Sequence, residues 1–165
     1  MQYWSGFYGV LAAAAATLLG LLFVSVSIDV ASRSGAARSG SRRIAEQAFQ
    51  NYVAVLLVSL VALIPDIDPP TLGIASLALT ATGTVLVLVR IYHLWQDGRS
   101  RLQLLRRQGS SLIGFIMLTF ASIKMVLGDR HLFNLFAASL IVLLASATMV
   151  SWELLVHLSG ERRPD

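Results

Sequence analysis

Apolar residues fill five long stretches of this chain, and short polar segments separate one stretch from the next. A helix needs about 20 mainly apolar residues to cross the hydrocarbon core of a bilayer. The first stretch carries no charge before Asp29 and shows no polar face, which is typical of a membrane span. The pattern predicts five transmembrane helices, at about residues 6–30, 45–64, 71–94, 110–127 and 132–158.

The composition agrees with this interpretation. Hydrophobic residues make up 56% of the 165 residues and charged residues only 13%, whereas about 25% of the residues of a soluble domain are charged. The chain has no cysteine, and therefore no disulfide and no thiolate metal site. These values argue against a soluble domain, a disordered chain or a disulfide scaffold. We expect an all-α fold, with residues 1–165 forming one polytopic bundle of five transmembrane helices.

Arginine is distributed very unequally among the segments that connect the predicted helices. Ten arginines lie in the C-terminal tail or in and around the first and third connections, whereas the other two connections together hold only Arg130. Because cationic loops stay on the cytoplasmic side, we expect the N-terminus outside and the C-terminus in the cytoplasm. The sequence pI of about 10.1 then reflects a basic collar that contacts anionic lipid headgroups, rather than a nucleic-acid site.

The second connection is an acidic turn with two prolines, Asp66-Ile67-Asp68-Pro69-Pro70. Asp68 is placed to cap the third helix, and a proline in the first helical turn has no N–H that needs a partner. The alternative interpretation is a pair of carboxylates, Asp66 and Asp68, that binds a cation. We prefer the cap, because the residues around it are those of a helix start.

Small residues recur at helical spacing in the first and third spans. Helices in lipid associate by close packing and polar contacts, so such stripes mark places where two backbones approach. The first stripe holds Gly9, Ala13, Thr17 and Gly20, and the second holds Gly73, Ser76, Thr80, Gly83 and Thr84. We therefore expect helices one and three in the interior of the bundle. The stripes mark either tight packing or hydroxyl groups that line a polar path.

Four ionisable residues near the cytoplasmic ends of the spans form a candidate polar cluster: Arg90, Glu153, His157 and Asp29. Charges within a membrane are costly and often functional. Arg90 and Glu153 lie at comparable depth, so we predict an ion pair in which each offsets the desolvation of the other. Arg90 can alternatively extend to the headgroups, and Asp29 can join the pair or take Arg33 as its partner.

Catalytic and ligand-binding motifs are missing from the sequence. It has no H-E-x-x-H, G-x-S-x-G or P-loop pattern, and its three histidines are widely separated. We therefore expect no catalytic, cofactor-binding or metal-binding residues, and no enzyme activity. An enzyme acting on lipid near Glu153 and His157 is the alternative of this class.

Two segments resemble a group of small bacterial multi-pass membrane proteins. They are Ala13–Asp29 (AAAATLLGLLFVSVSID) and Trp152–Leu158 (WELLVHL). The order of the spans is similar too, so the resemblance extends over most of the chain. Proteins of this group often carry the automatic description "modulator of FtsH protease", which implies no established activity. The resemblance implies a location in the bacterial inner membrane, and no site residue is carried over from it.

Two functions fit these observations. The first is a non-enzymatic structural or regulatory membrane protein that associates with itself or with another membrane protein. The second is a homo-oligomeric channel or carrier for ions or small solutes. In that case the hydroxyl stripe and the group of Arg90, Glu153 and His157 face the axis of the oligomer. Neither function requires a cofactor.

Overall fold

The computed structural model describes residues 2–32, 36–96, 101–128 and 133–160. Side chains are described for residues 4–28, 45–81, 83–85, 109, 111–128 and 133–153. The five helices are α1 (Gln2–Ser32), α2 (Ala36–Ala62), α3 (Pro69–Gln96), α4 (Arg101–Val126) and α5 (Phe133–Gly160). Every regular element in these ranges is a helix, which confirms the predicted all-α class.

Three helices contain a segment that is long and apolar enough to cross a membrane. These segments are Trp4–Ile28 in α1, Ala45–Ala62 in α2 and Phe133–Glu153 in α5. Ser111–Val126 in α4 is apolar but shorter. The chain therefore has the helices of a membrane protein, while spanning by α3 and α4 stays a prediction.

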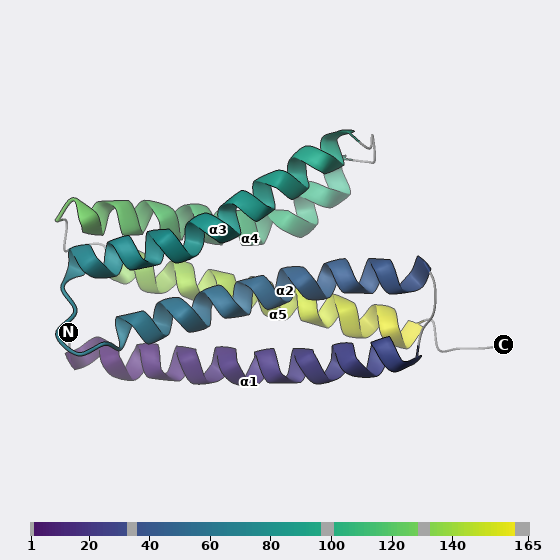
Figure 1. The fold of residues 1–165 in the computed structure, drawn as a ribbon, viewed down its shortest axis with the longest axis horizontal. Helices are drawn as coiled ribbons and strands as arrows, with labels where there is room; N and C mark the ends of the chain where they lie inside the picture. Colours follow the sequence, from purple (N-terminus) through teal and green to yellow (C-terminus); the bar gives the residue numbers. More distant parts are fainter. Residues whose placement is uncertain (1, 33–35, 97–100, 129–132, 161–165) are drawn as a thin grey trace.

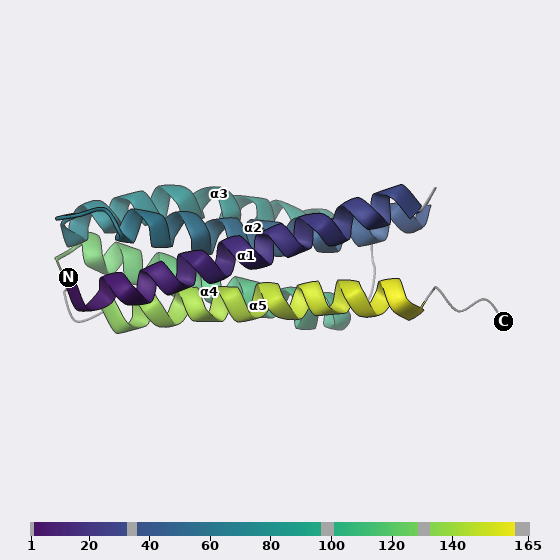
Figure 2. The ribbon, with the colours of Figure 1, turned by 90° about the horizontal axis from the view of Figure 1, so that it is seen from below.

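Successive helices run in opposite directions, as short connections require in a bundle (Figure 1). One end of the bundle carries the N-terminus of the chain, and we call it the N-terminal end. At the opposite end, α2 and α4 begin and α5 ends, as Figures 1 and 2 show. We call this the arginine end, after the backbone positions of Arg38, Arg42, Arg43, Arg101, Arg106 and Arg107.

Four of the helices form a ring in which each packs against the next, in the order α2, α3, α4, α5 and back to α2. The remaining helix, α1, lies outside the ring against α2 and, over a smaller contact, α5 (Figure 2). The expectation that α1 lies in the interior is therefore wrong for the single chain. Only 22% of the apolar span of α1 is buried, against 44% for the spans of α2 and α5.

Large apolar side chains fill the half of the ring near the N-terminal end. They are fully buried, and α4 and α5 supply most of them: Phe115, Leu118, Met125, Phe136, Leu140 and Leu143. Against this core, α1 buries Tyr8, whose ring meets that of Phe136 edge to face at 6.3 Å between centroids. Interdigitated packing of this kind is what holds helices together where lipid replaces water.

The turn between α2 and α3 confirms the predicted cap. One carboxylate oxygen of Asp68 accepts a bond from the backbone N–H of Thr71 at 3.3 Å, and the other accepts one from the Thr71 hydroxyl at 2.8 Å. Pro69 is the first residue of α3. Asp66 adopts φ 57°, a left-handed conformation that aspartate tolerates in turns. Both Asp68 oxygens are therefore engaged within the turn, which favours the cap over a cation site.

The cap gives a pH-dependent prediction. The bonds from Thr71 hold the pKa of Asp68 below its ordinary value of 3.8, so the cap stabilises the fold above that pH and is lost as pH falls through the lowered pKa. We expect Asp68→Ala to lower the unfolding temperature at neutral pH by about 2–4 °C. Asp68→Asn, which still caps, serves as the control. Thermal unfolding in detergent checks this, and an equal effect of Asp68→Ala in strong acid would contradict it.

Candidate functional site

The most conspicuous polar feature is a buried group of four neutral side chains inside the ring. We call it the Ser111 cluster: Gln47 and Asn51 from α2, Ser111 from α4 and Ser146 from α5. Their exposed fractions are only 7%, 1%, 1% and 2%. Because α2 and α4 stand on opposite sides of the ring, the cluster connects two helices that are not neighbours in it.

Ser111 is the centre of the hydrogen bonding. Its Oγ accepts bonds from Asn51 Nδ2 at 2.8 Å and from Gln47 Nε2 at 3.2 Å, and lies 2.8 Å from Ser146 Oγ. A hydroxyl oxygen has two lone pairs, and the two amides use both. The Ser111 proton therefore goes to Ser146. One serine thus joins α2, α4 and α5 by three bonds.

A second polar contact fastens α2 to α5 one residue beyond Asn51. The Tyr52 hydroxyl lies 3.4 Å from Thr148 Oγ1 and 3.3 Å from Ser151 Oγ. Both of these hydroxyls donate to carbonyl groups of their own helix, at 2.9 Å. The single proton of Tyr52 is therefore shared between two acceptors on α5. This contact and the Ser111 cluster hold helices together and contain no charged group that would act as an acid or a base.

The predicted stripe on α3 packs against α4. Ser76 Oγ lies 2.8 Å from Ser122 Oγ, and Thr80 Oγ1 donates to the carbonyl of Ser76 at 2.7 Å. A Cβ added to Gly73 would lie 2.8 Å from the carbonyl oxygen of Ser122. One added to Gly83 would lie 2.9 Å from the ring of Phe115. These contacts place the stripe at a helix–helix interface within the chain.

Thr84, the last member of the α3 stripe, differs from the others. Its side-chain oxygen is buried, and it has no hydrogen-bond partner among the described residues. It lies directly after Gly83, which packs against Phe115 of α4.

The predicted stripe on α1 faces away from the bundle. Ala13, Thr17 and Gly20 are exposed and Gly9 is half-buried. The Thr17 hydroxyl donates to the carbonyl of Ala13 in its own helix, at 2.8 Å. The inward face of α1 carries a different set of residues, the large Tyr8, Leu11 and Leu22 together with Ala12 and Ala15. The small residues of this outward stripe are therefore not explained by packing within one chain.

The predicted ion pair falls largely outside the described side chains. Arg90, His157 and Asp29 belong to α3, α5 and α1, and only their backbone positions are described. Glu153 is exposed on α5. Since α3 packs mainly on α2 and α4, whereas α5 packs on α2, α4 and α1, the structure does not bring α3 and α5 together as neighbours. The pairing of Arg90 with Glu153 stays a prediction.

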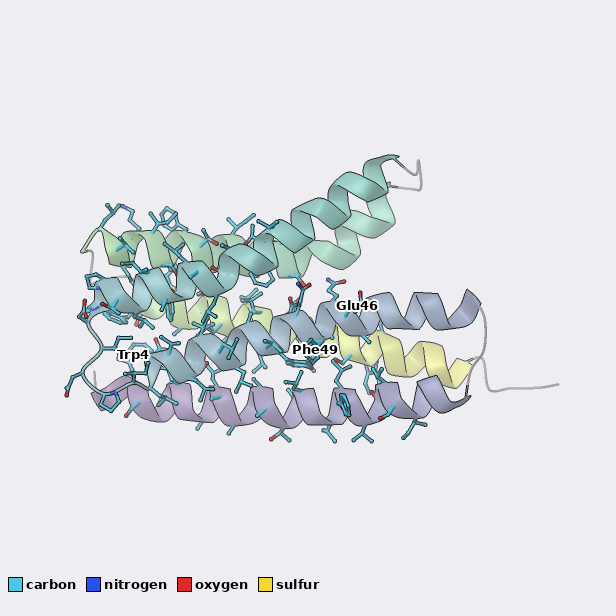
Figure 3. The ribbon with its side chains drawn as sticks, viewed as in Figure 1. Trp4, Glu46 and Phe49 are labelled. Atoms are coloured by element: carbon cyan, nitrogen blue, oxygen red, sulfur yellow. The ribbon has the colours of Figure 1, made fainter. Side chains whose placement is uncertain are left out.

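The Ser111 cluster was not anticipated from the sequence, although a signal for it exists. Gln47 and Asn51 are four residues apart, which places both amides on one face of a helix. Two amides on one face of an apolar span indicate a buried polar contact, because lipid offers them no partner. Glu46, exposed next to Gln47, extends towards the space between α2 and the α3–α4 hairpin (Figure 3).

Fold and polar contacts together define a helical membrane protein whose bundle is tied by neutral hydrogen bonds. No group of three or more His, Cys, Asp or Glu residues suited to a metal ion lies in the described part of the chain. No protein-family model, curated protein or solved structure matches the sequence or the fold.

Proposed function

We propose that this protein is a non-enzymatic structural or regulatory membrane protein that assembles with a second copy or with another membrane protein. The contact surface is the outward side of α1, which we call the α1 face: Gly9, Ala13, Ala16, Thr17 and Gly20. A transmembrane helix of the partner packs on this face, backbone against backbone, as small residues at four-residue spacing allow.

The observation that carries this proposal is a contrast among the glycines. Gly73, Gly83 and Gly114 each face a neighbouring helix so closely that an added Cβ would lie within 3 Å of it. At Gly9 and Gly20 an added Cβ would meet nothing within 4 Å. Glycine costs a helix about 1 kcal/mol relative to alanine. At Gly73, Gly83 and Gly114 close packing with a neighbouring helix offsets that cost. At Gly9 and Gly20 close packing with the helix of a partner would offset it in the same way.

The shape of the outward side of α1 supports the same conclusion. Large apolar side chains flank the small residues: Val10 is 71% exposed, Leu21 62% and Phe23 70%. Together with the small residues they form an exposed apolar surface. The described part of this side carries no charge, so the approach of another helix meets no repulsion.

The observed hydrogen bonds favour assembly over the alternative of a channel. The hydroxyls of Ser76 and Thr80 are buried and bonded to α4 or to their own helix, so within one chain they line no path. The members of the Ser111 cluster are bonded to one another through Ser111. Helix packing explains these polar groups without a transported solute.

The orientation forms part of the proposal. All five helices cross the membrane, with the arginine end in the cytoplasm, because both described clusters of arginine positions lie at that end. Anionic headgroups of that leaflet bind the arginines. The resemblance of the two terminal segments supports a bacterial inner membrane as the location.

Substitution on the α1 face tests the assembly. We expect Ala13→Ile to weaken association on the order of tenfold, because a branched side chain keeps the two backbones apart. Ala145→Ile, the same change at an exposed position of α5, is the control and should have no effect. Native mass spectrometry after extraction in mild detergent measures the assembly. The proposal would be refuted if the wild type were found only as a single chain of 17.9 kDa. It would also be refuted if the wild type and Ala13→Ile formed the same assembly in equal proportion.

A further inference from the structure

The outward side of α1 follows a seven-residue repeat over its apolar span. One line of positions recurs every seventh residue and holds only small residues: Gly6, Ala13, Gly20 and Ser27. A second line follows the first by four residues and holds only β-branched residues: Val10, Thr17 and Val24. All of these residues are exposed on the single chain. We call the two lines together the α1 seam, and it passes through the α1 face.

The spacing of the α1 seam is that of a helix wound around another helix. Its steps alternate between four and three residues, and a strict seven-residue repeat gives a left-handed supercoil. Small residues let the two backbones approach, and β-branched side chains, which are stiff, fill the spaces between them. From Gly6 to Ser27 the seam is about 30 Å long, which equals the thickness of the hydrocarbon core. A partner helix can therefore contact it across the whole membrane.

The outward side of α4 shows that spacing alone does not mark such a contact. Its exposed residues follow the same repeat but are all large: Ile113, Ile116, Phe120, Ile123 and Leu127. Large apolar side chains contact lipid tails as favourably as they contact another helix, and they keep backbones apart. The α4 side is therefore suited to lipid, whereas the α1 seam is suited to a helix.

Charge and depth in the membrane match the α1 seam to its own copy. Two copies related by a two-fold axis along the membrane normal place each residue of α1 opposite its equivalent, at the same depth. A charged residue would then face a like charge, and residues 4–28 of α1 hold none. The hydroxyls of Thr17 and Ser27 donate to carbonyls of their own helix, so they need no acceptor from the partner.

From these observations we propose that the partner is a second copy of this chain, whose α1 packs on α1 in parallel and in register. The helices cross with the left-handed geometry of a coiled coil, at about 20°. The line of small residues makes the closest contact, and Val10, Thr17 and Val24 pack beside it. This inference rests on the proposed assembly through the α1 face and adds the identity, direction and register of the partner helix.

Single engineered cysteines test the contact, because the chain has no cysteine of its own. Ala13→Cys and Gly20→Cys place a thiol on the seam. Leu21→Cys and Ile116→Cys place one at exposed positions outside it and serve as controls. A disulfide forms only where two Cα atoms come within about 7 Å. On oxidation in native membranes we expect the two seam variants to give at least about tenfold more covalent dimer than either control.

The outcomes separate this inference from the proposed assembly. Equal yields of dimer at positions 20 and 21 would overturn the seam. A disulfide between coexpressed Gly6→Cys and Ser27→Cys chains would overturn the parallel direction. If the seam variants give no dimer while a photo-reactive residue at Ala13 captures a different membrane protein, the second copy is wrong and the assembly stands. If Ala13 captures only lipid, both are wrong.

Discussion

Ser111→Ala is expected to lower the free energy of unfolding by about 2 kcal/mol, a large loss for the removal of one oxygen atom. The substitution deletes the acceptor of two buried amide groups and the donor to Ser146. A buried polar group left without a partner costs about 1–3 kcal/mol, while single polar contacts between membrane helices average about 0.6 kcal/mol. Reversible unfolding in mixed micelles measures the loss.

Two controls show whether the loss comes from the stranded amides. Ser139 is as deeply buried as Ser111, but its hydroxyl donates to Phe136 in its own helix. Ser139→Ala should therefore change stability by much less. The triple variant Gln47→Leu, Asn51→Leu, Ser111→Ala removes the unpaired amides as well, so it should be more stable than Ser111→Ala alone. If the triple variant were less stable, the central role of the hydrogen bonds would be wrong.

Gly73→Ala is the second substitution with a large expected effect. The added Cβ would lie 2.8 Å from the carbonyl oxygen of Ser122 and 2.9 Å from a methyl group of Val126. A backbone oxygen cannot move away by a side-chain rotation, so α3 and α4 must separate. The separation strains the hydrogen bond between Ser76 and Ser122. We expect a net loss of about 2 kcal/mol in the free energy of unfolding, typical of overpacking.

Alanine substitutions at two other glycines, Gly114 and Gly109, serve as comparisons for Gly73→Ala. At Gly114 the added Cβ would lie 2.8 Å from Cγ and Cδ2 of Leu143, which are side-chain atoms rather than backbone, so Gly114→Ala should cost less than Gly73→Ala. At Gly109 it would meet nothing, and alanine should raise helix stability by up to about 1 kcal/mol. The free energies of unfolding of the three variants, measured under one condition, give the order of their stabilities. A Gly73→Ala protein as stable as the wild type would contradict the structure.

Local features of the fold follow from the sequence because their causes are local. The all-helical class follows from the long apolar stretches, and Asp68 with Pro69 marks a helix start through residues adjacent in the chain. The α3 stripe was recognised from spacing alone, and Gly73 and Ser76 do lie against a neighbouring helix. Helix starts and small-residue spacing depend on a few neighbouring residues, which one sequence displays.

Features that depend on which helices become neighbours were not predicted correctly. The small residues of α1 suggested a central helix, yet α1 is peripheral and the predicted stripe faces away from the ring. Spacing indicates that a face is made for close packing, but it does not say whether the partner lies in the same chain. The Ser111 cluster joins residues 47 and 146 through α4, and a contact of such long range requires the arrangement of the helices.

The α1 face provides the most direct test of the whole account. A photo-reactive amino acid placed at Ala13, and separately at Ala145 as the control, reports which molecules touch each position in the native membrane. We expect Ala13 to form a covalent adduct with protein, either a second copy or another membrane protein, while Ala145 forms adducts with lipid only. Lipid adducts alone at Ala13, or equal protein adducts at both positions, would contradict the proposal that α1 binds a partner helix.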